Sequence, residues 1–228
     1  MTGIPATVAE APRSARRAVI FDLDGVIVDS FAVMEEAFAV AYKEVVGEGQ
    51  APFEEYRRHQ GRYFPDIMRI MGLPLEMEEP FVRESYRLAH QVPVFEGITE
   101  LLATLRSRRF KLAVATGKSG PRARSLLEQL GLLHFFDHVI GSDEVAHPKP
   151  APDIVVRALE LLELPAEEAI MIGDAPTDIA SAHGAGVASV AALWADVDDE
   201  DALLGAQPGA VLYRPDELLA LCPSVPRG

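Results

Sequence analysis

Two aspartates, Asp22 and Asp24, follow a short apolar run at residues 18–21. The length and β-branched content of the run indicate a buried strand. Side chains alternate along a strand, so both carboxylates leave it on the same side. In an open parallel sheet, ligands bind beyond the carboxyl ends of the strands. Two carboxylates placed there can divide the work, because one can attack or bind metal while the other moves protons.

An acidic turn and a calcium-binding loop are the alternatives for this Asp-x-Asp-Gly pattern. An EF-hand loop counted from Asp22 requires a glutamate at position 12, and Val33 stands there. The calcium loop is therefore excluded, and the acidic turn stays open.

Two more acids, Asp174 and Asp178, close a second apolar run at residues 169–173. If the two runs end at the same sheet edge, four carboxylates meet there and repel one another. A hard cation such as Mg²⁺ resolves this repulsion, since it prefers oxygen ligands and often keeps several waters. The alternative for Asp178 is that it merely caps the helix that follows.

The segment Thr116-Gly117-Lys118 joins an apolar run at residues 111–116 to a helix that starts near Pro121. Hydroxyl and backbone N–H donors between a strand and a helix suit a phosphate group. A P-loop would require glycine five residues before Gly117, and Leu112 occupies that position. The segment therefore predicts a phosphate contact, but not a P-loop.

Lys149 lies in a loop that contains three prolines, at positions 148, 150 and 152. Proline restricts the backbone, so we expect the lysine to be held rather than to swing freely. A fixed ammonium near several carboxylates would help to admit an anionic group. The alternative is an ordinary solvated lysine.

Five short apolar runs predict strands, and a sixth run is an additional candidate. The five lie at residues 18–21, 111–116, 138–141, 169–173 and 187–193, and the sixth at 210–213. Helical patterns at residues 121–130 and 152–162 separate some of these runs. Strands that alternate with helices form βαβ units, so we predict an α/β fold with a doubly wound parallel sheet.

Residues 30–92 interrupt this alternation with a purely helical pattern. Four helices are predicted here, ending near Gly47, Gly61, Gly72 and His90. A helical block between the first two strands indicates an inserted domain. We therefore expect a disordered tail at residues 1–17, a core domain of residues 18–29 plus 93–221, and a helical domain of residues 30–92.

Composition limits the partners and the compartment. The chain has 228 residues and a formal net charge of −14, which disfavours nucleic acid and anionic membranes. No apolar segment is long enough to span a bilayer. The single cysteine, Cys222, allows no internal disulfide, which fits the cytoplasm. The oligomeric state is not predicted.

These motifs, in this order, make the chain resemble the haloacid dehalogenase superfamily of phosphotransferases. The matching residues are Asp22-Leu23-Asp24-Gly25-Val26-Ile27-Val28-Asp29-Ser30, Thr116, Lys149-Pro150, and Gly173-Asp174 with Asp178. The resemblance covers residues 18 to about 213. It implies a Rossmann-like core with strand order 3-2-1-4-5. The helical insert resembles the small four-helix cap of the phosphoglycolate phosphatase and β-phosphoglucomutase branch.

The resemblance also implies a role for each residue. Asp22 would be the nucleophile that forms an aspartyl-phosphate, and Asp24 the general acid and base. Thr116 and the Gly117 amide would hold phosphoryl oxygens. Lys149 would neutralise charge on the nucleophile and the phosphate. Mg²⁺ would be bound by Asp22, the Asp24 carbonyl and Asp174, with Asp178 assisting.

Gly117 departs from many relatives, which have Asn or Ser there. An aspartate with an ordinary pKa of about 3.9 is ionised at neutral pH.

Other activities of the superfamily fit the sequence less well. Dehalogenases lack the second acid, which is present here as Asp24. Phosphomutases carry a histidine in the first cap helix, but residues 31–36 contain none. Phosphonate-cleaving relatives need a cap lysine, and the only one is Lys43, deep in the first helix. A non-enzymatic module that binds metal or phosphate stays an alternative of a different class.

A narrower resemblance concerns the substrate. Residues 57–72 with residues 115–120 resemble phosphatases associated with 3-amino-5-hydroxybenzoate formation, in antibiotic pathways. The runner-up is a general phosphoglycolate phosphatase. The expected substrate is a small phosphorylated metabolite, a sugar phosphate or a phosphorylated acid. In capped relatives the turn between the second and third cap helices lies over the active site, so Arg62 and Tyr63 are predicted to select the substrate.

Overall fold

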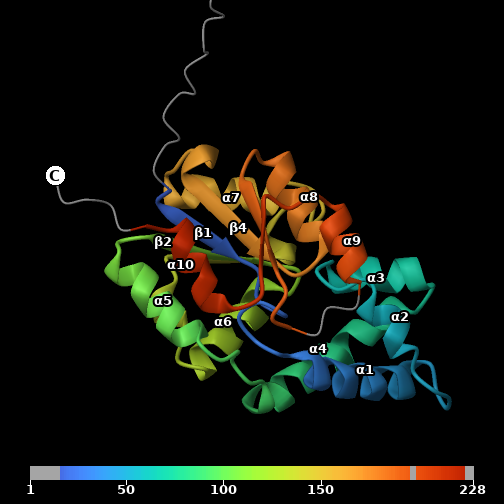
Figure 1. Ribbon diagram of the computed structural model, residues 1–228. Helices are drawn as coiled ribbons and strands as arrows, with labels where there is room; N and C mark the ends of the chain where they lie inside the picture. The colour runs from blue at the N-terminus through green and yellow to red at the C-terminus, as the bar shows by residue number, and fades with distance from the viewer. Residues whose placement is uncertain (1–15, 196–198, 224–228) are drawn as a thin grey trace, which may run out of the picture.

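The computed structural model describes residues 16–195 and 199–223. Its centre is a sheet of six parallel strands in the order β3-β2-β1-β4-β5-β6 (Figure 1). The strands are β1 (Ala18–Phe21), β2 (Lys111–Thr116), β3 (His138–Gly141), β4 (Ala169–Gly173), β5 (Ala188–Ala192) and β6 (Ala210–Leu212). The predicted doubly wound α/β fold and its strand order are confirmed, and β6 extends the sheet by one strand.

Helices cover both faces of this sheet (Figure 1). α5 (Ile98–Ser107), α6 (Gly120–Gln129) and α10 (Leu218–Leu221) lie on one face, and α7 (Asp153–Leu162) and α8 (Pro176–Gly184) on the other. The alternation of β1 explains the two layers, because Val19 and Phe21 pack with the first set, whereas Ala18 and Ile20 pack with the second. α9 (Glu200–Gly205) packs against α8 and β5 in a smaller cluster.

Helices α1 to α4 form a layer of their own between β1 and α5. They are α1 (Phe31–Val45), α2 (Phe53–Arg57), α3 (Phe64–Met71) and α4 (Glu78–Leu88). Their apolar faces meet in a separate core, built around rings such as Phe38, Tyr56 and Phe81. The second predicted helix is shorter than expected, because the chain turns after Arg57 instead of continuing to Gly61.

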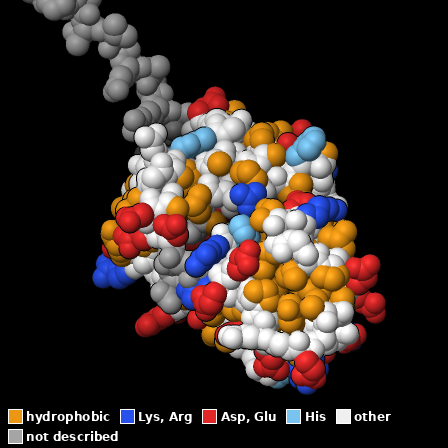
Figure 2. Space-filling model, turned by 90° about the vertical axis from the view of Figure 1, so that its right-hand side faces the viewer, with side chains coloured by type: hydrophobic (Ala, Val, Ile, Leu, Met, Phe, Trp, Pro, Cys, Tyr) orange, Lys and Arg blue, Asp and Glu red, His pale blue; other side chains and the backbone are white. Residues whose placement is uncertain are grey.

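Short 3₁₀ turns complete the described chain. They lie at Leu75–Met77, Ala89–Gln91, Leu133–Phe135, Ser142–Glu144, Ala166–Glu168 and Pro215–Glu217. Figure 2 shows hydrophobic side chains gathered on the surface in the lower part of its view; Val46, Ile70 and Leu75, all in the helical segment, are among the exposed large hydrophobic residues.

The ends of the chain fall largely outside the described residues. Of the tail predicted at residues 1–17, residues 1–15 lie outside them. Arg17 belongs to the sheet, since its N–H donates to the Glu168 carbonyl and its carbonyl accepts from Lys111. Within residues 16–195 and 199–223, no helix combines the length and apolarity that crossing a membrane requires.

Candidate active site

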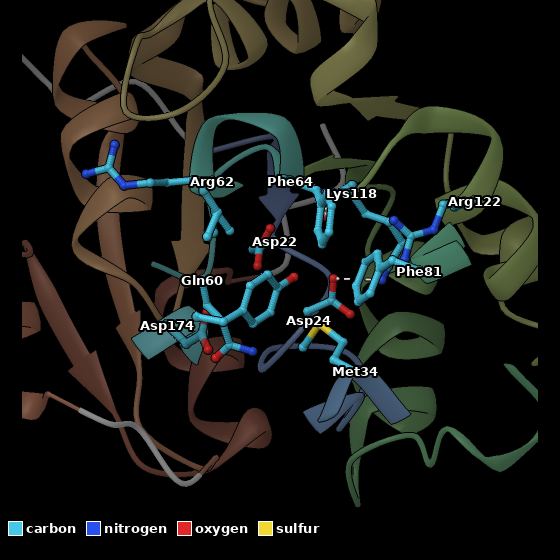
Figure 3. A pocket seen from close by; sticks show the side chains of 15 residues that line it. Asp22, Asp24, Met34, Gln60, Arg62, Phe64, Phe81, Lys118, Arg122 and Asp174 are labelled. Carbon is cyan, nitrogen blue, oxygen red and sulfur yellow. Dashed lines mark hydrogen bonds and ion pairs between the residues drawn. The ribbon is translucent and has the colours of Figure 1, made fainter. Parts of the chain in front are cut away.

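The carboxyl ends of β1, β2 and β4 bring the predicted site residues together. Phe21, the last residue of β1, pairs with Val114 of β2 and Ile172 of β4. Asp22 and Asp174 follow directly at this edge and face one pocket together with Asp24 (Figure 3). The edge lies where the strand order reverses, because the chain winds from β1 to β3 in one direction and from β4 to β6 in the other.

Lys149 lies between two of the acids. Its Nζ donates to Asp22 Oδ1 over 2.7 Å and to Asp178 Oδ1 over 2.6 Å. The side chain is fully buried, so the predicted held lysine is observed and the solvated alternative is wrong. Burial alone would lower the pKa of Lys149, but Asp178 and Asp22 beside it raise the pKa above its usual value.

Three carboxylates form a cluster around this lysine. Oxygens of Asp22, Asp174 and Asp178 all lie within 4.8 Å of one another. Burial, followed by the Asp178 charge, raises the pKa of Asp22 to about 7 although Lys149 opposes the shift. Burial and the charges of Asp22 and Asp178 raise the pKa of Asp174 as well. One ammonium therefore does not compensate three clustered acids, of which Asp22 and Asp178 are buried and Asp174 is partly buried, and the oxygen cluster fits a hard divalent cation.

Two features position Asp174 and Asp178, the acids that follow β4. Gly25 adopts a φ of +81°, and a Cβ on it would lie 1.8 Å from Asp174 Oδ2, so only glycine permits this approach. Asp178 Oδ2 accepts the N–H of Ala175 at the start of α8. Asp178 thus caps the helix, as the alternative supposed, and also binds Lys149.

The Asp24 carboxylate has partners of its own, outside the three-acid cluster. Its Oδ1 accepts from Ser30 Oγ over 2.5 Å, and its Oδ2 lies 3.2 Å from Lys118 Nζ. Burial lowers the pKa of Lys118, and Asp24 opposes that shift. Asp22 and Asp24 are therefore each paired with a different lysine.

The phosphate-binding segment predicted from the sequence lies beside these acids. Thr116 is buried, and its Oγ1 accepts the N–H of Lys118 over 3.1 Å. A Cβ at Gly117 would lie 2.7 Å from the carbonyl oxygen of Gly61 and 2.8 Å from that of Arg62. The absence of a side chain at Gly117 thus lets the turn between α2 and α3 rest on the strand end. A side chain such as Asn or Ser at this position would collide with the two carbonyl oxygens of the turn.

The turn between α2 and α3 reaches the site through its backbone. Figure 3 shows the Arg62 guanidinium directed away from Asp22 and Asp24. Tyr63 is not among the residues that line the pocket. The residues predicted to select the substrate therefore lie at the turn, but their side chains are not gathered around the acids.

Other side chains that line the pocket are absent from the predicted site. Lys118 and Arg122 come from the β2–α6 region, and Tyr56 and Gln60 come from the helical segment. Arg122 shares the buried face of α6 with apolar residues. A basic residue on an apolar helix face is the signal in the sequence that could have identified it.

Comparison with known proteins identifies the family of this chain. The family model described as haloacid dehalogenase-like hydrolase matches residues 19–192. The protein belongs to this family. This hydrolase is 34% identical over 207 residues to "Probable phosphatase IndB" of Dickeya dadantii, and the match covers 85% of this chain and 88% of the relative. It is 32% identical over 218 residues to the "Phosphorylated carbohydrates phosphatase" of Thermotoga maritima, and the match covers 89% of this chain and 96% of the relative.

A solved structure agrees with this assignment. The haloacid dehalogenase-like family hydrolase from Streptococcus pneumoniae superposes with a TM-score of 0.79 at 28% identity, covering 90% of this chain and 97% of that chain. Other relatives are named pyrophosphatase and phosphoglycolate phosphatase. This haloacid dehalogenase-like hydrolase is therefore a phosphatase, that is, a phosphoric monoester hydrolase.

Proposed function

We propose that this phosphatase hydrolyses a small phosphorylated metabolite through an aspartyl-phosphate on Asp22, with Mg²⁺ as cofactor. One observation carries the proposal: two aspartates at the same strand end, Asp22 and Asp24, are paired with different lysines. A nucleophile and a proton donor require unlike environments: Asp22 is buried in the cluster with Asp174 and Asp178, whereas Asp24 is partly exposed and also accepts from Ser30 Oγ.

The site residues divide the steps of this reaction between them. An Asp22 oxygen attacks phosphorus while the bond from phosphorus to the leaving oxygen breaks, and Asp24 gives its proton to that oxygen. Water then attacks the aspartyl-phosphate, Asp24 takes its proton, and phosphate leaves with Asp22 regenerated. The Thr116 hydroxyl and the Gly117 N–H donate to phosphoryl oxygens, and Lys149 balances the charge of Asp22 and the phosphoryl group. Phosphoryl transfer depends mainly on such positioning and charge compensation.

The cation would be held by Asp22, the backbone carbonyl of Asp24 and Asp174, with Asp178 assisting. The clustering of carboxylate oxygens within 4.8 Å supports this assignment. When bound, Mg²⁺ would offset the charge of the acids and the phosphate and favour the ionised form of Asp22. The expectation that Asp22 has an ordinary pKa and is fully ionised at neutral pH is wrong, because burial raises the pKa of Asp22 to about 7.

Substrate choice is assigned to the helical domain of residues 30–92, acting as a cap on the core of residues 18–29 plus 93–221. Arg62 and Tyr63 are the candidates at its turn, and Arg62→Ala is expected to change kcat/KM for the natural substrate. The resemblance of residues 57–72 favours a phosphorylated precursor in 3-amino-5-hydroxybenzoate synthesis, in the cytoplasm. A phosphoglycolate phosphatase is the second candidate, which relatives of that name support. A phosphomutase is disfavoured because residues 31–36 lack histidine.

Turnover of p-nitrophenyl phosphate tests the proposal. Wild-type protein with Mg²⁺ is expected to release nitrophenolate steadily, and Asp22→Asn is expected to release none. Binding of phosphate or Mg²⁺ without any turnover would instead favour the non-enzymatic module. A screen of sugar phosphates and phosphorylated acids then separates the substrate classes.

A further inference from the structure

Arg122 is a buried cation that the reaction described above does not use. It lies in the first turn of α6, is 8% exposed and lines the pocket that contains Asp22 and Asp24. Lys149 and Lys118, the other buried cations at the site, are each paired with aspartate. Among residues 16–195 and 199–223, no ion pair is formed by Arg122; its nearest polar partner is neutral, the Ser85 hydroxyl at 2.9 Å.

The guanidinium is nevertheless fixed in place. Ser85 Oγ accepts from Arg122 Nη2 and itself donates to the Phe81 carbonyl over 2.7 Å. The guanidinium carbon also lies 5.0 Å from the centroid of the Phe81 ring. Two elements, α4 and α6, thus hold one orientation of the side chain, which reduces the conformational entropy that a bound ligand would have to remove.

Among the described residues no carboxylate contacts this buried guanidinium, and the charges of Asp24 and Glu78 act on it only from a distance. Arginine stays protonated even though burial lowers its pKa, and it offers five N–H donors, of which Ser85 takes one. A buried charge is costly unless it is paired. The remaining donors therefore suit an oxyanion that enters the pocket, and their planar arrangement suits two oxygens at once.

The wall of the pocket beside Arg122 is apolar. The rings of Phe64 and Phe81 stack with centroids 4.3 Å apart, and Met34 and Ile67 also line the pocket. Figure 3 shows Phe81 next to Arg122 and Phe64 next to it in turn. A ligand that reaches Arg122 from Asp22 therefore also contacts apolar surface.

We propose that Arg122 binds an oxyanion on the leaving group of the substrate, so that preferred substrates carry a second anionic group in addition to the phosphoryl group that is cleaved. This inference rests on the proposed function, since it assigns a substrate class to the same pocket. A carboxylate and a second phosphate share the required chemistry, and matched substrates distinguish them.

The test compares kcat/KM within pairs that differ in one group. Two pairs replace carboxylate by carboxamide: 2-phosphoglycolate with its amide, and 4-carboxyphenyl with 4-carbamoylphenyl phosphate. A third compares fructose 1,6-bisphosphate with fructose 6-phosphate. Wild-type enzyme is expected to favour the anionic member of at least one pair about tenfold or more, the effect of a hydrogen-bonded charge. The pair that shows the preference identifies the anion.

In Arg122→Gln, the ratio of kcat/KM for the anionic member to kcat/KM for the neutral member is expected to fall close to one. Arg122→Lys is expected to keep part of the preference. Arg124→Gln is the matched control, because Arg124 lies on the same helix and binds Glu144 on the surface. Its ratio should equal that of the wild type. A wild-type ratio near one in all pairs, or an unchanged ratio in Arg122→Gln, would overturn the inference.

Different results would contradict the role of Arg122 and the proposed function. If p-nitrophenyl phosphate is hydrolysed but all ratios are near one, only the role of Arg122 is wrong. If no phosphomonoester is hydrolysed with Mg²⁺, the proposed function is wrong, and the substrate class that depends on it falls with it.

Discussion

The Nζ of Lys149 lies 2.7 Å from Oδ1 of Asp22, although 127 positions separate the two residues in the chain. Asp22 directly follows β1, whereas Lys149 lies in the loop before α7. The ammonium binds the carboxylate oxygen and leaves the cluster of acids with a single internal cation. The nucleophile proposed for the reaction is thus held by a partner that the fold supplies from a distant segment.

Removal of Lys149 should therefore affect both catalysis and stability. Lys149→Met leaves Asp22 and Asp178 without their cation, and breaking a buried ion pair in this way costs about 3–5 kcal/mol of folding free energy. We expect turnover of p-nitrophenyl phosphate to be lost and the thermal midpoint to fall. Lys43→Met is the control, because the Lys43 side chain is 73% exposed and should tolerate the change. An active, equally stable Lys149→Met protein would contradict the role of Lys149.

Asp24→Asn should separate folding from proton transfer. Asparagine has nearly the shape of aspartate, but it neither gives nor takes a proton. General acid–base groups contribute roughly 10²–10⁴-fold, so kcat should fall by that order while the thermal midpoint changes little. Asp29→Asn is the control, since Asp29 is exposed and lies outside the pocket. An unchanged kcat would make Asp24 a structural residue.

Metal dependence should be complete, because the buried acids and the phosphate repel one another without a cation. Dialysis against EDTA is expected to abolish turnover, and Mg²⁺ to restore it. Full turnover by the metal-free protein would refute the assignment of the acidic cluster.

The raised pKa of Asp22 sets the sign of the pH dependence expected for the proposed metal site. The pKa is 3.8 without the shift and about 7 in the folded, metal-free protein. Between these values the folded protein keeps a proton that the unfolded chain has released, so the free energy of unfolding falls as pH rises. Mg²⁺ requires the ionised acids and should raise the thermal midpoint more at pH 8 than at pH 5. An equal or larger increase at pH 5 would contradict this linkage.

The contact between Gly117 and the turn at Gly61 predicts the effect of a single methyl group. In Gly117→Ala the new Cβ would meet two backbone carbonyl oxygens at 2.7 and 2.8 Å, and backbone atoms cannot rotate away. The turn should be displaced, and a displacement of about 1 Å costs on the order of 10²-fold in rate. Gly205→Ala is the control, because a Cβ there meets open space. Equal activity of the two variants would show that the turn plays no part in the reaction.

The strands could be predicted closely because each is a short apolar run separated from the next by a helical pattern or a turn. The run predicted at residues 187–193 forms β5 at Ala188–Ala192, for example. The end of α2 could not be predicted in this way. Its chain turns at residues 58–61 to bring the Gly61 carbonyl onto Gly117, a tertiary contact that the local pattern does not contain.

In the candidate site, too, some features could be predicted from local sequence and others depend on distant segments. Asp22, Thr116 and Asp174 were predictable because each stands at or directly after the end of a strand. Lys149 was predictable because prolines restrict the loop that holds it. The raised pKa of Asp22 was not, since it results from burial and from Asp178, which is far away in the chain. The inward position of Arg122 likewise depends on Ser85 and Phe81 of α4. Local spacing identifies reactive groups, whereas their electrostatic environment depends on the packing of distant segments.

The most direct test of the aspartyl-phosphate is to trap it. Asp24→Asn lacks the base that activates water, whereas nitrophenolate leaves without a proton donor, so the first step should proceed and the second should stall. After reaction with p-nitrophenyl phosphate and Mg²⁺ and quenching in acid, mass spectrometry should find one added phosphoryl group on the peptide that contains Asp22. The Asp22→Asn, Asp24→Asn double variant should show none. A phosphoryl group on another residue, or hydrolysis by Asp22→Asn at the wild-type rate, would contradict the central claim that Asp22 is the nucleophile.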